Sequence, residues 1–199
     1  ARATCQPVAL GADSISDEEL TKLSSAERSR YFENAALTQA VAMRWLTILV
    51  ASGQSQGEPW PRFAAWLEAV KEKLWPTTLI SLCRLAAHTK ELELFALETS
   101  AYTFHRIETL TGEHAESRVT LYTDLARSVL SLSPEESSAY FDRAFVIAGR
   151  IGEENLSRWN ALVNLGRAAG DPALPRPELA YRFSQAAELT ESYAEKGFD

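Results

Sequence analysis

A short pattern recurs in this chain at intervals of 40 residues, centred on Leu85, Leu125 and Leu165. In each copy a bulky apolar residue precedes the leucine by three positions, and a small residue follows it. Residues three and four apart share one face of a helix, and a small residue there lets a neighbouring helix approach closely. Self-similarity at a fixed period is typical of stacked supersecondary units, so the sequence predicts an array of helical repeats. The copies are Leu82 with Leu85 and Ala86, Tyr122 with Leu125 and Ala126, and Leu162 with Leu165 and Gly166.

The segments ahead of two copies repeat as well. The tripeptides at 111–113 (Thr-Gly-Glu) and 151–153 (Ile-Gly-Glu) are 40 residues apart, and so are the Ser-Arg pairs at 117–118 and 157–158. Because these matches fall in the same register as the leucines, they support the same period.

The composition fits a helical globular protein. Hydrophobic residues make up 46% of the 199 positions, an ordinary value for a folded domain. No segment alternates apolar and polar residues as a half-buried strand does. The net charge of −7 argues against general nucleic-acid binding, which needs clustered Lys and Arg. No apolar run approaches the roughly 20 residues that span a bilayer. We therefore expect an all-α protein with no nucleic-acid partner and no membrane partner.

The expected layout is a flexible lead-in over residues 1–15 and a single helical-repeat domain over 16–199. Helical hairpins are predicted over about 25–75, 77–111, 114–150 and 154–196. The chain begins without Met, which is consistent with a fragment of a larger protein. Two cysteines, Cys5 and Cys83, are too few for a disulfide framework, so a reduced, cytoplasmic setting is expected.

Local signals place several helix ends. Ser24 or Ser25, with Glu27, predicts the start of a helix that runs to about residue 51. Ser133 precedes a proline and two glutamates, which together supply a cap, a first-turn proline and acids that face the positive end of the helix dipole. Pro76 is expected to end a helix over 62–74, which follows a loop over 53–61. The other helices are predicted over 77–88, 91–110, 114–131, 135–150, 154–169 and 177–196.

The segment around residues 140–152 resembles the second helix of a tetratricopeptide repeat. In that family an aromatic residue is followed three positions later by alanine, and Phe141 with Ala144 matches this spacing. Phe183 and Ala186 repeat it near the end of the chain. The Leu162, Leu165 and Gly166 triplet is similar to the family's first-helix pattern of a large apolar residue and then Leu-Gly.

The resemblance covers residues 77–196 and is closest over 116–196. It implies a right-handed superhelix of antiparallel helical hairpins, which is a tetratricopeptide-like α-solenoid. The sequence departs from the family in its period, which is 40 rather than the usual 34. Counting 40 residues back from Phe141 and Ala144 gives Ala101 and Phe104, which reverses the large and small positions. Ala169 stands where the family usually has Tyr.

No arrangement typical of a catalytic or metal centre is present in the sequence. The histidines at 88, 105 and 114 have no His or Cys at metal-ligand spacing, and there is no glycine-rich phosphate loop or nucleophile elbow. Cys83 adjoins Leu82 of the repeat pattern and is predicted to be packed rather than nucleophilic. We therefore expect neither catalysis nor a cofactor. Trp60, between two prolines in the predicted loop, is a candidate interface anchor.

The resemblance implies that the first helices of the hairpins line a concave groove that holds an extended peptide. Side chains that point away from the leucine face would then contact the peptide. Arg127 and Arg167 are 40 residues apart and are suited to bidentate contact with carboxylates, although they could instead pair with acids of neighbouring helices. We therefore expect a protein or peptide partner that is acidic or has a free C-terminal carboxylate. The predicted groove residues are Thr120, Thr123, Asp124, Arg127, Asn160, Val163, Asn164 and Arg167.

An alternative function is an oligomerisation or regulatory arm of a larger multidomain protein, for example a signalling ATPase, with no peptide ligand of its own. A terminal repeat normally needs a polar capping helix. Tyr193, Ala194 and Phe198 supply no obvious polar cap, so this alternative predicts a homodimer through the C-terminal end.

Overall fold

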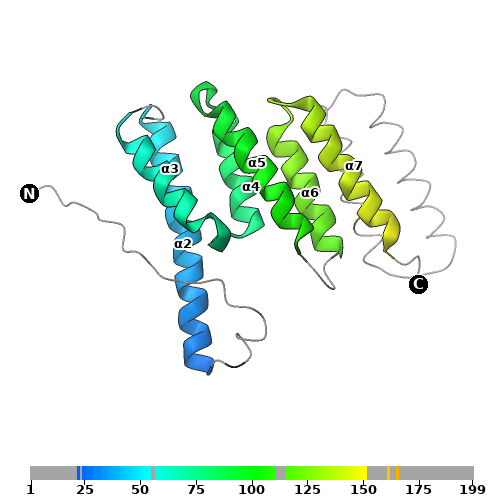
Figure 1. Ribbon diagram of the computed structural model, residues 1–199, viewed down its shortest axis with the longest axis horizontal. Helices are drawn as coiled ribbons and strands as arrows, with labels where there is room; N and C mark the ends of the chain where they lie inside the picture. The colour runs from blue at the N-terminus through cyan, green and yellow to red at the C-terminus, as the bar shows by residue number, and fades with distance from the viewer. Residues whose placement is uncertain are drawn as a thin grey trace, which may run out of the picture. The chain divides into compact units, whose positions relative to one another are not determined.

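The computed structural model describes residues 24–54, 57–110 and 115–151, together with Lys22, Ala161 and Leu165. Over these residues it contains six α-helices, two short 3-10 helices and no strand, as Figure 1 shows. The predicted all-α class is therefore confirmed. None of the helices in the described part is long and apolar enough to cross a bilayer. The predicted lead-in, the helices beyond residue 151 and the residues expected to close the C-terminal end lie outside the described residues.

Most of the predicted helices are present, with ends shifted by a few residues. The helices are α2 (Ser25–Ala51), α3 (Pro59–Val70), η1 (Lys71–Lys73), α4 (Pro76–Ala86), η2 (Lys90–Leu92), α5 (Glu93–Glu108), α6 (Ala115–Val129) and α7 (Pro134–Arg150).

Of the two serines predicted to start α2, Ser24 is the cap, and the predicted cap at Ser133 is confirmed. The Ser24 side chain accepts a hydrogen bond from the Glu27 amide, and the Glu27 carboxylate accepts one from the Ser24 amide at 2.9 Å. Ser133 Oγ accepts from the Glu136 amide at 3.3 Å at the start of α7. At the other end of α2, Gly53 takes a positive φ of 64°, a conformation that costs glycine little. Its amide and that of Gln54 donate to the carbonyls of Val50 and Leu49, which is a Schellman ending.

The predicted loop over 53–61 is too long. Helix α3 already begins at Pro59, because proline lacks the amide hydrogen that a first-turn residue leaves unpaired and its φ suits a helix. Trp60 consequently lies in the first turn of α3 and not in a loop. The helix ends at Val70 and tightens into η1, and Leu74 is extended ahead of Trp75 and Pro76. Pro76 itself starts α4, the same first-turn role.

The chain divides into two compact units, with the boundary between Thr78 and Leu79. In the first unit, α2 packs on α3 around Phe63, which is fully buried and has the ring of Trp45 edge-on at 5.5 Å. The buried Gln39 holds the chain after η1 in place. Its amide nitrogen donates to the Lys73 carbonyl at 3.1 Å, and its oxygen accepts from the Trp75 amide at 3.0 Å.

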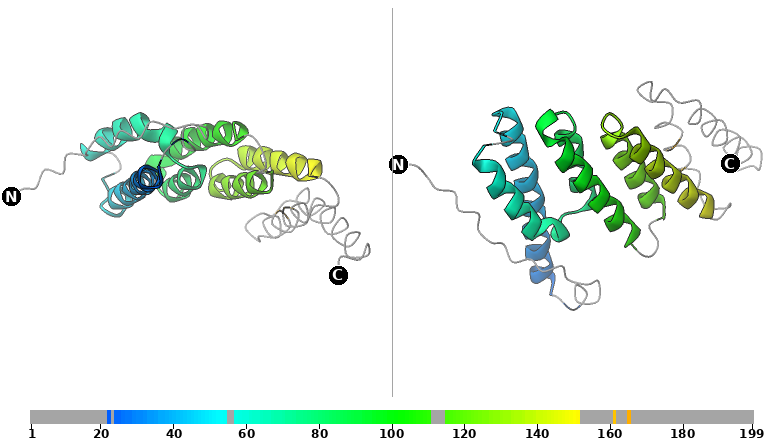
Figure 2. Two further views of the ribbon diagram at one scale, coloured as in Figure 1. Left: turned by 90° about the horizontal axis from the view of Figure 1, so that it is seen from below. Right: turned by 45° about the horizontal axis from the view of Figure 1, so that its top comes forward.

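In the second unit, α4 and α6 lie in one layer and α5 and α7 in the other, as the left view of Figure 2 shows. Its core is one continuous cluster that includes Cys83, Ile107, Tyr122 and Phe141. The repeat positions Leu82, Ala86, Tyr122, Leu125, Ala126 and Leu165 are all buried. Leu85 is only half-buried, so α4 buries its copy of the pattern less completely than α6.

The first helices of the two hairpins repeat every 40 residues, but the second helices repeat every 41. Four buried pairs relate α4 to α6 at the shorter interval: Leu79 and Val119, Leu82 and Tyr122, Cys83 and Thr123, Ala86 and Ala126. Five buried pairs relate α5 to α7 at the longer one: Ala96 and Ser137, Thr99 and Tyr140, Ser100 and Phe141, Thr103 and Ala144, Ile107 and Ala148.

This difference explains the reversal of large and small residues in the sequence comparison. Ala101 is exposed on α5, whereas Phe141 is buried on α7, so the two are not equivalent. The structural partners of Phe141 and Ala144 are Ser100 and Thr103, both fully buried. Ala86 and Ala96 are ten residues apart, whereas Ala126 and Ser137 are eleven apart, so the extra residue lies in the α6–α7 connection.

Candidate interaction surface

Helix α6 is buried on most sides, and its buried residues include Val119, Tyr122, Ala126 and Val129. Its two exposed residues, Ser117 and Arg127, lie with the half-buried Thr120 and Asp124 on one strip at a spacing of three and four residues. Polar and charged groups thus gather along one line of α6 that is open to a partner.

Four of the predicted groove residues lie on this helix, and they differ in exposure. Arg127 is exposed, and the Asp124 side chain is 43% exposed. Thr120 is half-buried and donates to the Glu116 carbonyl at 3.3 Å. Thr123 is buried, and its hydroxyl donates to the Val119 carbonyl at 2.8 Å. Its side chain therefore belongs to the packing of α6 and not to the open strip.

The other predicted groove residues, Asn160, Val163, Asn164 and Arg167, lie outside the described residues. Trp60, the predicted interface anchor, is half-buried on α3 in the first unit. Its ring is 5.6 Å from that of Phe63, so it forms part of an aromatic cluster.

Arg84 joins this surface from α4, although the sequence prediction did not include it. Its Nη2 lies 4.0 Å from Oδ1 of Asp124, and the two residues are 40 positions apart. The repeat period applied to Asp124 would have found it. At 54% and 43% exposure, with this separation, the pair is weak and leaves both groups accessible to a ligand. We call Arg84, Thr120, Asp124 and Arg127 the first-helix strip.

The strongest electrostatic cluster in the described residues lies elsewhere, where α5, α6 and α7 meet. Glu108, the last residue of α5, accepts hydrogen bonds from Nε and Nη2 of Arg143 at 2.5 and 2.6 Å. The Tyr122 hydroxyl donates to the same carboxylate at 2.6 Å. Arg118 Nη2 lies 3.6 Å from it. This cluster ties the last turn of one hairpin to both helices of the next.

The cluster fixes the ionisation of its members. The hydrogen bonds from Arg143, with further help from Tyr122 and the charge of Arg118, lower the pKa of Glu108 to about 2. Burial, together with the neighbouring carboxylate, raises the pKa of Tyr122. Glu108 is therefore ionised at neutral pH and unsuited to donating a proton. No pattern in the sequence signals this cluster, because its members are brought together by tertiary packing.

Two further buried groups keep their protons. Burial raises the pKa of the Cys83 thiol to about 12, which agrees with the prediction of a packed cysteine. Burial also raises the pKa of Tyr140 to about 12. Its hydroxyl lies 3.2 Å from both Ser100 Oγ and the Glu136 carboxylate, which accepts its hydrogen bond. Among the described residues, no three His, Cys, Asp or Glu side chains are grouped to hold a metal ion.

Comparisons of the chain with protein-family models, with curated proteins and with solved structures give no match.

Proposed function

We propose that this chain is a protein-interaction module, a tetratricopeptide-like α-solenoid that binds an acidic protein or peptide segment along its first helices. The supporting observation is the first-helix strip. It places Arg84, Asp124 and Arg127 on the open side of helices whose other sides are packed.

The charge of the strip favours an acidic ligand. Two guanidinium groups and one carboxylate leave a net positive charge on a chain whose overall charge is −7. Arginine is suited to carboxylates because its planar fork can donate two parallel hydrogen bonds. A ligand carboxylate can approach Arg84 readily because the existing pair with Asp124 is long and exposed.

The test uses a fluorescent acidic dodecapeptide prepared with a free C-terminal carboxylate and, separately, with a C-terminal amide. Replacing Arg84 and Arg127 by alanine should weaken binding about tenfold or more, which is about 1.4 kcal/mol. A further Arg167→Ala change tests whether the arginine at the corresponding position of the next repeat also contributes to peptide binding. The matched control is Arg62→Ala, since Arg62 is an exposed arginine that pairs with Glu58 on α3. A preference for the free carboxylate over the amide would locate the peptide's end in the strip.

Equal binding of the peptide by the wild type and by the Arg84/Arg127 variant would refute this site. If the protein then also forms a concentration-dependent dimer in sedimentation, the oligomerisation-arm alternative would be favoured. A fall in melting temperature of the variant, with lost helicity, would mean that the arginines are structural.

A further inference from the structure

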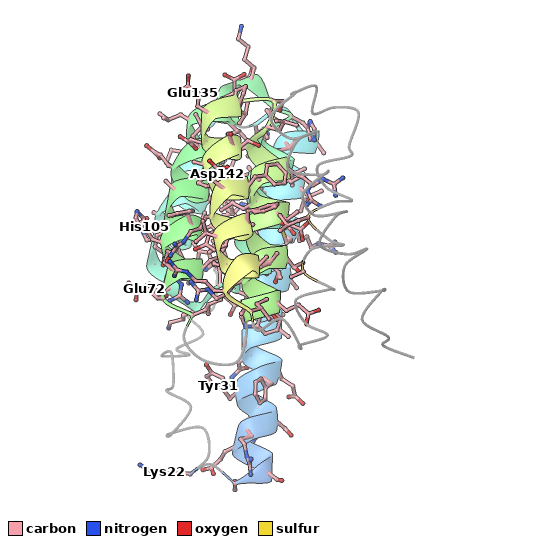
Figure 3. The ribbon with its side chains drawn as sticks, turned by 90° about the vertical axis from the view of Figure 1, so that its right-hand side faces the viewer. Lys22, Tyr31, Glu72, His105, Glu135 and Asp142 are labelled. Carbon is pink, nitrogen blue, oxygen red and sulfur yellow. The ribbon has the colours of Figure 1, made fainter. Side chains whose placement is uncertain are left out.

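A second open surface lies on the opposite layer of the second unit, along the outward sides of α5 and α7. Four exposed positions of α5 follow helical spacing along one side, namely Leu94, Glu98, Ala101 and His105. Adding 41 to each gives Glu135, Ala139, Asp142 and Val146 on α7, all exposed except the half-buried Asp142. Figure 3 shows Glu135, Asp142 and His105 on the same side of the ribbon. We call these eight residues the outer ridge.

The two helices of the outer ridge are direct neighbours. Ser100 Oγ of α5 lies 3.2 Å from the Tyr140 hydroxyl of α7, and 3.3 Å from the Glu136 carboxylate to which it donates. The rings of Phe104 and Tyr140 stack with centroids 5.1 Å apart. These contacts join residues 36 to 40 positions apart and hold α5 and α7 side by side, so the ridge is one continuous surface.

Two large apolar side chains of the ridge are exposed, one on each helix. Leu94 is 69% exposed and Val146 is 46% exposed. Alanines lie between them, at 101 and 139, and both are exposed. Burying such a side chain against a partner is favourable because it removes apolar surface from water. Small residues between two apolar anchors let the backbone of a partner approach closely.

The charges around Leu94 indicate what kind of partner would fit. Four exposed carboxylates surround the amino-terminal half of the ridge, against one exposed ammonium group at Lys90. Acids in the first turn of a helix are expected from the helix dipole. Glu98 is beyond the first turn of α5 and has no ion-pair partner among the described residues, so the dipole does not account for it. The four carboxylates are Glu91, Glu93, Glu98 and Glu135.

We propose that the outer ridge docks a basic amphipathic helix of a partner protein. Leu94 and Val146 supply the apolar contacts, and the carboxylates of the amino-terminal half select lysine and arginine. This surface is separate from the first-helix strip and takes a ligand of the opposite charge, so the inference goes beyond the proposed function.

The structure sets the spacing of the partner's anchors. The contacts between α5 and α7 join residues 36 to 40 positions apart, so Val146 lies level with about residues 106 to 110 of α5, which is 12 to 16 residues beyond Leu94. This difference in level is about 18 to 24 Å at 1.5 Å per residue. Neighbouring helices have axes about 8 to 10 Å apart, so the diagonal is roughly 20 to 26 Å. A docked helix would therefore carry its two apolar anchors about 13 to 17 residues apart, or about four turns.

The test uses a 22-residue alanine-based helical peptide with lysines on one face and leucines at positions 4 and 18. A second peptide has glutamate in place of every lysine, and a third has a single leucine. Binding to the whole chain is measured by fluorescence anisotropy at several salt concentrations. The variants are Leu94→Ser with Val146→Ser, and Glu98→Gln. Matched controls on α2 are Ile48→Ser, whose isoleucine is 53% exposed, and Glu33→Gln, whose glutamate is exposed.

We expect the double serine variant to bind the two-leucine lysine peptide at least tenfold more weakly, and Glu98→Gln to bind it about threefold more weakly. The α2 controls and the Arg84/Arg127 variant should bind it as the wild type does. The proposal is overturned if the lysine peptide does not bind the wild type, if the ridge variants bind it unchanged, or if the glutamate peptide binds equally well. It is also overturned if Leu94→Ser abolishes a dimer seen in sedimentation, because the occupant would then be a second copy of this chain.

Discussion

Replacing Glu108 by glutamine should destabilise the second unit in a way that depends on pH. Glutamine keeps an acceptor for Tyr122 but removes the charge that Arg143 and Arg118 face. A pKa lowered from 4.5 to about 2 corresponds to about 3.4 kcal/mol of folding free energy if it is fully expressed. Because Arg143 is 32% exposed and salt screens the cluster, we expect about 1 to 2 kcal/mol. For a chain of this length, that lowers the melting temperature by about 2 to 8 °C.

The pH dependence has a definite sign. The folded-state pKa of Glu108 is below the unfolded one, so its contribution to stability is complete above about pH 4.5. As the pH falls from 4.5 towards 2, the unfolded chain takes up the proton before the folded one, and the contribution disappears. The difference between the wild type and Glu108→Gln should therefore be largest at neutral pH and should shrink steadily below pH 4.5.

The assay is thermal unfolding followed by circular dichroism at about pH 7, 4 and 3, with Glu98→Gln as the exposed control. Equal melting temperatures of the two proteins at pH 7 would contradict a stabilising role of the Glu108 charge. That role is also refuted if the difference at pH 3 is as large as at pH 7, since that would mean that Glu108 contributes through packing and not through its charge.

Two further predictions concern the core. Leu125→Ala should lower the free energy of unfolding in urea by about 2 to 5 kcal/mol because Leu125 is fully buried. Leu94→Ala, at a 69% exposed site, should change it by no more than about 0.5 kcal/mol, and equal losses would contradict the described packing. In a Cys5→Ser variant, the Cys83 thiol should react with a thiol reagent only slowly at pH 8 and quickly in urea, because burial raises its pKa to about 12. Fast labelling of the native protein would show that α4 opens readily.

Features that depend on neighbours in sequence were predictable. The start of α2 was predicted at Ser24 or Ser25 and that of α7 at Ser133, and the structure has caps at Ser24 and Ser133. The period of 40 predicted the buried positions of α6 and its equivalence with α4. Helix ends were less predictable, because α3 and α4 begin at prolines that can either start or stop a helix.

Features that depend on tertiary packing were not predictable from the sequence. Thr123 was expected in the groove, but α6 is so widely covered that only a narrow strip of it stays open. Arg143 and Glu108 are 35 positions apart, which matches no period in the chain. The outer ridge could not be predicted from the sequence either, because the burial pattern of α5 recurs on α7 after 41 residues rather than 40.

The unequal intervals of the two helix layers have a consequence for recombining this chain. A chimera in which α7 is exchanged for α5 by counting 40 residues would rotate every side chain by about 100°, since each helical residue turns by that angle. Tyr140 and Phe141 would be swapped for the buried Ser100 and the exposed Ala101, and the acids of the ridge would turn towards the interior. Counting 41 residues would keep the buried positions of the two helices equivalent. The length of the α6–α7 connection thus sets the difference between the repeat intervals of the two layers. A single residue inserted there lengthens the interval of the second helices and leaves that of the first helices unchanged.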